Sequence, residues 1–186
     1  MKAGLSYRDR PLAFTDVETT GLDETQHEII EIGLVLADQR TLDVIAKMNV
    51  LVKPEHIERA EARALEVNGY DEEKWRDAGP LKDAMDVYAQ MTRNAMFIAH
   101  SVTHDWAFIK AAFRQTGVMN QMDYHRIDLW TVAYEALKDA ADCHSLRLKD
   151  ICSFLGVPEE PMPHRGINGA LSALEVYRQL QILRRP

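Results

Sequence analysis

The chain has 186 residues, of which 46% are hydrophobic and 27% are charged, and its formal net charge at pH 7 is −7. This length and composition are typical of one globular domain with a sizeable core, so we expect a single domain over residues 1–186. The acidic balance argues against a long basic surface for duplex DNA, because such a surface needs many Lys and Arg contacts to phosphates.

No window of the sequence is apolar enough for a membrane-spanning helix, and residues 1–10 lack the apolar stretch of a signal peptide. We therefore expect a cytoplasmic protein that has no membrane partner. Cys143 and Cys152 have neither a metal-binding nor a redox spacing. They are predicted to be reduced thiols, with Cys152 partly buried.

The first half of the chain predicts an antiparallel meander of three strands followed by two helices. After an irregular lead-in over residues 1–10, apolar runs with short polar connections predict strands at residues 12–17, 29–37 and 44–52. The helices are predicted at residues 58–67, where Asn68-Gly69 supplies a stop signal, and at residues 80–93.

The second half alternates between short strands and helices. Strands are predicted at residues 95–100 and 125–128, and helices at residues 103–115, from the second strand through Leu137, at 145–155 and at 167–183. A meander followed by this alternation predicts an α/β fold. Its mixed central sheet combines the antiparallel meander with parallel strands and carries helices on both faces.

The stretch from Phe14 to Leu22 contains the first chemical signal. Asp16 and Glu18 lie two residues apart in a predicted strand, so both side chains point to the same face. Two neighbouring carboxylates repel each other and lose hydration when they are buried, and a divalent cation between them offsets both effects. An acidic strand end that faces solvent is the simpler alternative, because Asp-x-Glu alone is a weak signal.

The next residues, Thr19-Thr20-Gly21-Leu22, strengthen the ligand-binding interpretation. Gly21 allows the backbone to pass close to a ligand. The two threonines offer hydroxyl groups and backbone N–H groups for hydrogen bonds.

Two later patches add an acid and a histidine. Asp105 follows a short buried strand and falls in the first turn of a predicted helix, where the helix dipole favours an anion. His164 lies in the loop before the last helix, where an imidazole can take a proton from water. Taken singly, each is better explained as structural: Asp105 as a helix-start acid, His164 as a helix cap, and His104 as a surface or packing residue.

The order of these patches, with the residues around them, resembles the DEDDh or DnaQ-like family of 3′–5′ exonucleases, whose fold is ribonuclease H-like. The resemblance extends from about Leu12 to Leu183. The supporting segments are residues 14–22, 65–69, 99–109, 127–129 and 145–157.

The resemblance implies phosphodiester hydrolysis with two Mg²⁺ or Mn²⁺ ions roughly 4 Å apart, acting on single-stranded DNA or RNA 3′ ends and releasing nucleoside 5′-monophosphates. By resemblance, Asp16 would bridge both ions, Glu18 would hold the ion beside the attacking water, and Asp105 would hold the ion beside the leaving oxygen. His164 would take the proton from that water. The remaining implied residues contact the terminal nucleotide: Thr19, Thr20, Gly21, Leu22, His100, Ser101 and Phe108.

The third motif departs from the family pattern His-Arg-Ala-Leu-x-Asp-Ala. When the His-Arg pairs are aligned, the position of the Asp, which is the fourth metal ligand, is occupied by Gly169, and residues 165–174 contain no Asp or Glu. Asn168 would point roughly 100° away around a helix, and its amide is a weaker ligand than a carboxylate. The second motif departs as well, with Ser101 in place of Asn and His104 in place of an aromatic residue.

We therefore expect a retained nucleotide site in which one ion is weakly held or absent, so that hydrolysis is impaired. Two alternatives stay open. One is an active exonuclease in which a neighbouring carboxylate, a water or the substrate phosphate replaces the missing ligand. The other is a non-catalytic module that binds nucleic acid ends or a protein partner.

Gly169 would also be explained by an introduced substitution. A calcium or zinc loop is disfavoured, because no segment has the required spacing. The sequence leaves open DNA and RNA as substrates, stand-alone and proofreading roles, and the oligomeric state.

Overall fold

The computed structural model describes residues 6–183, and its elements follow the predicted order. The strands are β1 (Leu12–Thr19), β2 (Ile29–Ala37), β3 (Val44–Leu51), β4 (Met96–Ala99) and β5 (Arg126–Asp128). The α-helices are α1 (Ala62–Asn68), α2 (Leu81–Met91), α3 (Val102–Thr116), α4 (Leu129–Leu137), α5 (Leu148–Leu155) and α6 (Gly166–Leu183). Two 3₁₀ helices, η1 (Tyr7–Asp9) and η2 (Ile57–Arg59), precede β1 and α1. Among residues 6–183, none of the helices is long and apolar enough to cross a membrane.

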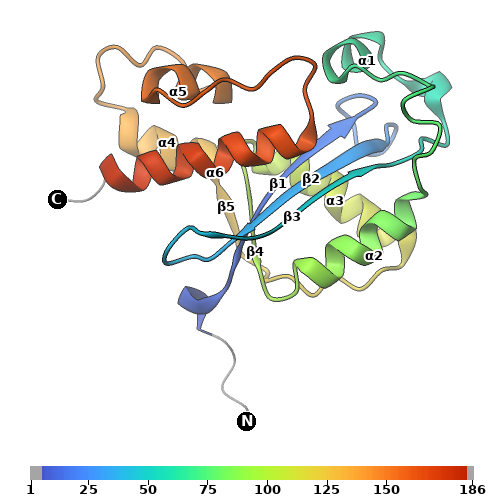
Figure 1. The fold of residues 1–186 in the computed structure, drawn as a ribbon, viewed down its shortest axis with the longest axis horizontal. Coiled ribbons are helices and arrows are strands. Elements are labelled where there is room, and N and C mark those ends of the chain that lie inside the picture. The colour runs from blue at the N-terminus through green and yellow to red at the C-terminus, as the bar shows by residue number, and fades with distance from the viewer. Residues whose placement is uncertain (1–5, 184–186) are drawn as a thin grey trace.

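The five strands form one mixed sheet in the order β3-β2-β1-β4-β5 (Figure 1). β2 pairs antiparallel with β1 and with β3, which confirms the predicted meander. β4 lies parallel to β1, and β5 lies parallel to β4. α2 and α3 cover one face of the sheet, and α4, α5 and α6 cover the other. The predicted α/β architecture is therefore confirmed.

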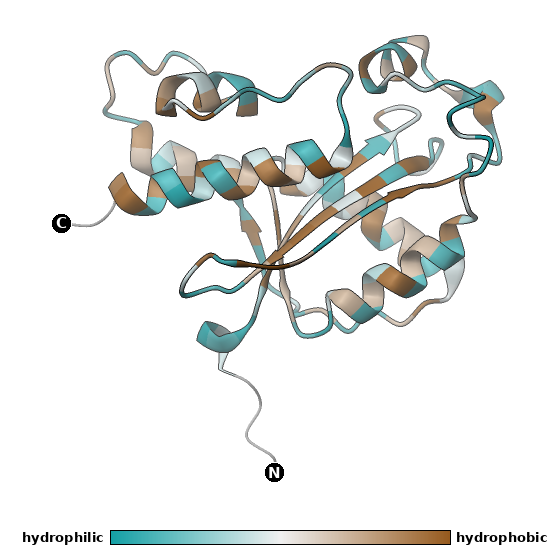
Figure 2. Cartoon of the chain, viewed as in Figure 1, coloured by the Kyte–Doolittle hydropathy of each residue, from teal (hydrophilic) through white to brown (hydrophobic). Residues whose placement is uncertain are grey.

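Alternation along β1 divides the core into two halves. Ala13 packs with residues of α2 and α3, whereas Leu12 and Phe14 pack with residues of α4, α5 and α6. Hydrophobic residues are concentrated in the strands of the central sheet (Figure 2). Because the alternation continues toward the end of β1, Asp16 and Glu18 fall on the face of Leu12 and Phe14, which is the face that α6 covers.

The predicted helix over residues 58–67 is wrong in its first part. The chain forms η2, then becomes extended at Ala60 and Glu61, and α1 begins only at Ala62. The Glu61 backbone N–H donates to the Thr20 carbonyl oxygen at 2.7 Å, so a tertiary hydrogen bond interrupts the helix. Its predicted end is confirmed, because Gly69 adopts a left-handed conformation with φ of 64°.

Two further boundaries differ from the prediction. The lead-in is not irregular in its described part: residues 7–9 form η1, and the Arg8 backbone N–H donates to the Ser6 hydroxyl at 3.3 Å. Residues 1–5 of the lead-in lie outside the described residues. The helix predicted from residue 145 begins only at Leu148, and Ser145 lies in the preceding loop, where its hydroxyl donates to the Asp150 carboxylate at 2.5 Å.

Both cysteines are free thiols in the described structure. Cys152 is fully rather than partly buried, and it packs in the core half that contains α4, α5 and α6. Burial raises the pKa of its thiol to about 11, so the group is protonated and behaves as an apolar core residue at neutral pH.

The start of α6 lies directly against the backbone of the sheet. A Cβ atom at Gly33 in β2 would lie 1.9 Å from the carbonyl carbon of Gly166, and a Cβ atom at Gly166 would lie 2.9 Å from the Asp16 carbonyl oxygen. No residue larger than glycine fits at either position without separating the helix from the sheet. This contact fixes the first turn of α6 beside the end of β1.

We predict that Gly33→Ala lowers the free energy of unfolding by about 3 kcal/mol, because its methyl group must displace backbone atoms of α6. Urea unfolding measures the change. The matched control is Gly79→Ala, since a Cβ at Gly79 would meet no described atom within 4 Å. The control is expected to change stability by less than about 1 kcal/mol, and an equal effect of both variants would contradict the prediction.

Candidate active site

A cleft of about 670 Å³ opens where the end of β1 meets the starts of α3 and α6. We call it the acidic cleft, because five carboxylates from three parts of the chain line it, and four of them concern the chemistry. They are Asp16, Glu18, Asp105 and Glu160. The other lining residues that concern the chemistry are His100, Ser101, His104, His164 and Ser172, with Arg63, Arg147 and Lys149 as the cationic ones.

Each of the first three carboxylates is positioned by the element that carries it. Asp16 and Glu18 reach the cleft from the α6-facing side of β1. Asp105 lies in the first turn of α3, as the sequence predicted, and its Oδ1 accepts a hydrogen bond from the Val17 backbone N–H at 3.2 Å. This bond holds α3 against β1 and keeps the Asp105 carboxylate beside the other two.

Burial makes this arrangement electrostatically unfavourable without a cation. Burial, and then the negative charges of Asp105 and Glu18, raise the pKa of Asp16 well above its usual range. Burial, and then the charge of Glu160, raise the pKa of Glu18 to about 8. Burial raises the pKa of Asp105 to about 7, against the opposing effect of its hydrogen bond from Val17. A bound cation would reverse these shifts.

The donor set fits Mg²⁺ or Mn²⁺ in its chemistry, because these ions prefer anionic oxygen ligands. Asp16, Glu18 and Asp105 are the residues that would hold the ions. Within residues 6–183, no group of three or more His, Cys, Asp or Glu side chains is arranged so that it could hold a metal ion without moving.

Glu160 and His164 form a pair on the loop that leads into α6. The His164 Nδ1 lies 2.7 Å from Glu160 Oε2, and the Arg165 backbone N–H donates to Glu160 Oε1 at 2.9 Å. The His164 backbone N–H donates to the Val67 carbonyl oxygen at 3.1 Å, which ties the loop to α1. The largely buried Glu160 carboxylate thus holds both residues of the His-Arg pair.

Arg165 is held by the sheet. Its Nε lies 3.2 Å from the Glu31 carboxylate, and its guanidinium lies over the Trp75 ring, 5.0 Å from the centroid. Glu31 is fully buried and pairs with Glu18 across β1 and β2. Arg165 therefore offsets part of the negative charge that accumulates beside Glu18, while the neighbouring His164 stays in the cleft.

Position 169 faces the Asp16 carboxylate of β1. A Cβ atom built on Gly169 would lie 2.4 Å from Asp16 Oδ2 and 2.6 Å from its Cγ. Asn168 lines a different pocket together with Leu171 and Glu175. A side chain at 169 would therefore point at Asp16, and Asp16 would have to turn to admit it.

Five of the residues expected to contact substrate lie elsewhere. The Thr19 hydroxyl donates to the Gly21 carbonyl oxygen at 2.7 Å, and the Thr20 hydroxyl accepts from the Glu28 backbone N–H at 2.9 Å, so both hold the turn after β1. Leu22 is 75% exposed at this turn. None of the residues from Thr19 to Leu22 is among the described residues that line the acidic cleft.

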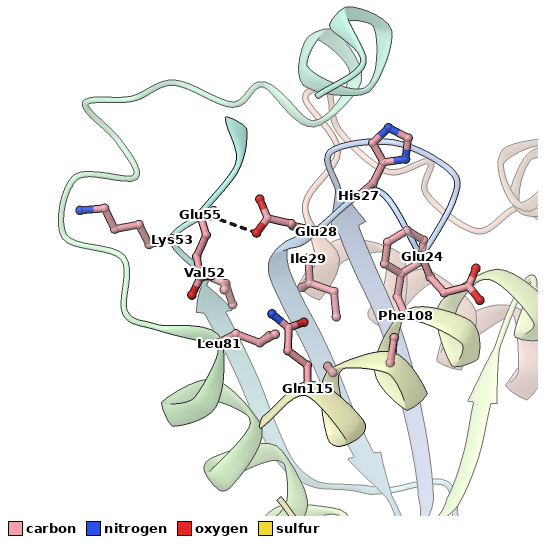
Figure 3. A pocket seen from close by; sticks show the side chains of 12 residues that line it. Glu24, His27, Glu28, Ile29, Val52, Lys53, Glu55, Leu81, Phe108 and Gln115 are labelled. Atoms are coloured by element: carbon pink, nitrogen blue, oxygen red, sulfur yellow. Dashed lines mark hydrogen bonds between the residues drawn. The ribbon is translucent and has the colours of Figure 1, made fainter. Parts of the chain in front are cut away.

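Phe108 is only 2% exposed and belongs to the core half of α2 and α3. It borders a small separate pocket near Glu24, His27 and Gln115 (Figure 3). Phe108 is thus not among the described residues that line the acidic cleft, but its ring centroid lies 5.0 Å from that of His104, which does line it. His100 and Ser101 also line the cleft, and their contact with substrate stays a prediction.

A family model described as Exonuclease matches residues 13–177. The chain belongs to the exonuclease family. The match covers every lining residue of the acidic cleft that carries a carboxylate or an imidazole.

Two curated relatives of this exonuclease chain are described as DNA polymerase III PolC-type. The protein from Thermotoga petrophila is 26% identical over 92% of this chain, and that from Caldanaerobacter subterraneus subsp. tengcongensis is 24% identical over 87%. The chain spans only 12% and 11% of the length of these relatives.

Solved structures with the same fold include DEDDh nuclease domains. The nuclease domain of 3′hExo, a DEDDh family member bound to rAMP, has a TM-score of 0.71 and 19% identity, with 95% of this chain and 94% of that chain covered. E. coli Exonuclease I in complex with a dT13 oligonucleotide has a TM-score of 0.78 and 15% identity, with 92% of this chain and 41% of that chain covered. The fold is thus that of the ribonuclease H-like exonucleases.

The sequence analysis did not identify Glu160 and Ser172 as residues of the acidic cleft. Glu160 lies in an irregular loop, where no periodicity indicates that its side chain turns back to His164. Ser172 could have been found, because a residue three positions after Gly169 lies on the same side of a helix. His104 was expected to be a surface or packing residue, and it packs against Phe108 with ring centroids 5.0 Å apart while also lining the cleft; burial lowers its pKa.

We predict that the metal-free protein loses stability as the pH rises from about 5 to about 8. The pKa values of Asp16, Glu18 and Asp105 are raised in the folded state, so the folded protein binds more protons than the unfolded chain in this range. Stabilisation is complete below the ordinary carboxyl pKa and is lost as the pH passes the folded-state values.

Thermal melts in a chelating buffer measure this effect. Asp16→Asn removes one of the repelling charges, so the melting temperature of this variant is expected to depend less on pH than that of the wild type. Mg²⁺ is expected to restore stability to the wild-type protein at the upper end of the range. A melting temperature that is independent of pH, with and without Mg²⁺, would contradict the burial of ionisable carboxylates in this cleft.

Proposed function

We propose that the chain is a metal-dependent 3′–5′ exonuclease domain that acts on single-stranded DNA or RNA 3′ ends in the cytoplasm and releases nucleoside 5′-monophosphates. Its turnover is reduced because position 169 carries glycine. The observation that carries this proposal is the convergence of Asp16, Glu18, Asp105 and His164 in one cleft of a chain from the exonuclease family.

Bound Mg²⁺ or Mn²⁺ supplies Lewis-acid activation of the water and of the leaving oxygen. Asp16, Glu18 and Asp105 provide the anionic ligands. His164 takes the proton from the attacking water at Nε2. Glu160 accepts a hydrogen bond from Nδ1, which favours the tautomer whose Nε2 is free to accept that proton.

Because position 169 is glycine, it supplies no second carboxylate ligand beside Asp16. A charged ligand at this position would share a cation with Asp16, since its Cβ points at the Asp16 carboxylate. Its loss weakens the hold on the ion and the alignment of the water, and transition-state stabilisation is sensitive to such displacements. Glu160 is the neighbouring carboxylate that supports residual activity, because it already lies in the cleft.

The second candidate function is a non-catalytic module that binds nucleic acid ends or a protein partner. Gly169 is the observation that favours it. Three buried, mutually repelling carboxylates favour the enzyme, because a binding module without chemistry would be more stable if they were lost. The relatives described as DNA polymerase III PolC-type support a DNA polymerase as the protein partner.

We predict that Gly169→Asp raises the rate of 3′-end degradation roughly 100-fold, because it adds an anionic ligand beside Asp16. The assay follows the release of nucleoside 5′-monophosphates from a single strand with Mg²⁺ or Mn²⁺. The control is Asn168→Asp, which adds the same charge to α6 in another direction. A second readout is the rise in melting temperature with Mg²⁺, which should be larger for Gly169→Asp than for Asn168→Asp.

The outcomes separate the candidate functions. A wild-type protein that is as fast as Gly169→Asp would show that no ligand is missing. If neither protein releases monophosphates but both bind single strands, the non-catalytic module is the correct function. Activity that survives His164→Ala unchanged would remove the assigned role of His164 as proton acceptor.

We predict that Glu160→Gln lowers the rate of the active protein roughly 10- to 100-fold. Gln keeps the size of the side chain and can accept from the Arg165 N–H, but it removes the negative partner of His164 Nδ1. Glu159→Gln is the control, because Glu159 also lines the cleft without bonding to His164; equal effects of the two substitutions would contradict the pairing.

A further inference from the structure

A second groove, of about 650 Å³, continues from the acidic cleft along α4. We call it the aromatic groove. It shares His100, Ser101, Arg147 and Leu148 with the acidic cleft, so the two depressions are continuous. A chain that leaves the acidic cleft past these residues enters the aromatic groove directly.

Two parallel aromatic rings form one wall of the aromatic groove. Trp130 and Tyr134 lie one turn apart on α4, with ring centroids 5.7 Å apart and an interplanar angle of 6°. They are 45% and 44% exposed. Large exposed ring faces of this kind suit the stacking of nucleobases, which needs a flat apolar surface and no particular base sequence.

The charge of the aromatic groove differs from that of the whole protein. The chain has a formal net charge of −7, but the described residues that line this groove include Lys138 and Arg147 and no Asp or Glu. Each of these cations has an ion-pair partner outside the lining, Glu135 for Lys138 and Asp150 for Arg147. Exposed pairs of this kind are weak, so both cations remain able to contact phosphates.

The aromatic groove is rigidly connected to the acidic cleft. The Trp130 backbone N–H donates to the His100 carbonyl oxygen at 3.2 Å, and the Val102 backbone N–H donates to Asp128 Oδ1 at 3.3 Å. These two bonds join the start of α4 to the start of α3. The distance from the rings of α4 to Asp105 in the first turn of α3 is therefore fixed by the fold.

We propose that the aromatic groove binds the part of a single-stranded nucleic acid that precedes its 3′-terminal nucleotide. Bases of this segment stack on Trp130 and Tyr134, and its phosphates contact Lys138 and Arg147. The proposal rests on the proposed function, because the 3′ end of the same strand occupies the acidic cleft. The combination of flat rings, cations and continuity with the acidic cleft favours this occupant over a peptide.

Fluorescence anisotropy with 5′-labelled oligothymidylates tests the proposal, with Ca²⁺ in place of Mg²⁺ to suppress hydrolysis. The probes have two and about eight nucleotides, so that only the longer one reaches the aromatic groove. In the wild type, the longer probe should bind more tightly. The double variant Trp130→Ala, Tyr134→Ala should weaken its binding roughly 5- to 150-fold and leave the short probe unchanged.

Matched variants separate stacking from damage to the fold. Tyr124→Ala removes a ring that is 81% exposed outside the groove and should have no effect on either probe. Trp130→Phe keeps a ring and should retain most of the affinity for the longer probe. Thermal melts show whether the double variant is folded; if it is not, Trp130→Ala and Trp130→Phe are compared instead.

The two failures are distinguishable. If the short probe binds to the wild type but the double variant keeps full affinity for the longer one, the aromatic groove is not a strand-binding surface and the proposed function stands. Such a result would leave the rings as a contact for a protein partner. If neither probe binds to the wild type, the proposed function and this inference both fail.

Discussion

The backbone contact between Gly33 and Gly166 is the constraint on which the site depends. It presses the first turn of α6 onto β2 with no side chain between them. Asp16 is the residue of β1 that pairs with Gly33, so α6 passes directly beside it. The loop before α6 and position 169 within it are consequently fixed relative to the end of β1. A larger residue at either glycine would move all of these groups together.

The contact between Gly33 and Gly166 lies beside a group of carboxylates that repel one another. Asp16, Glu18 and Glu31 occupy neighbouring positions of β1 and β2, and Arg165 is the only cation that an ion pair brings to them among the described residues. The raised pKa values of Asp16, Glu18 and Glu31 show that this one cation does not offset their burial and mutual repulsion. An additional carboxylate at position 169 would increase the repulsion in the metal-free protein. Glycine at this position avoids that added repulsion in the metal-free fold.

The sequence predicted those features that follow from local periodicity. β2 has the bounds that its apolar run indicated, and the side chains of Asp16 and Glu18 share a face because strands alternate. Tertiary contacts could not be predicted in this way. The hydrogen bond from Glu61 to Thr20 breaks a helix, and the loop that turns Glu160 toward His164 has no periodic signal. The resemblance to the family supplied the order of the site residues, but Thr19, Thr20 and Phe108, expected to contact the terminal nucleotide, are not among the described residues that line the cleft.

The distribution of charge is compatible with the proposed binding of a polyanion by an acidic protein. Uniform basic surfaces bind long duplexes, and a net charge of −7 opposes that mode. Without metal, the carboxylates of the acidic cleft would repel a phosphate. A divalent cation bound to them would neutralise their charge and attract one phosphate. Beyond the acidic cleft, the aromatic groove offers stacking, which contributes affinity without requiring net positive charge. Affinity would then come from one strand end and a few unstacked bases. A duplex presents neither of these, so the same charge pattern that weakens general nucleic acid binding would select for a frayed or single-stranded 3′ terminus.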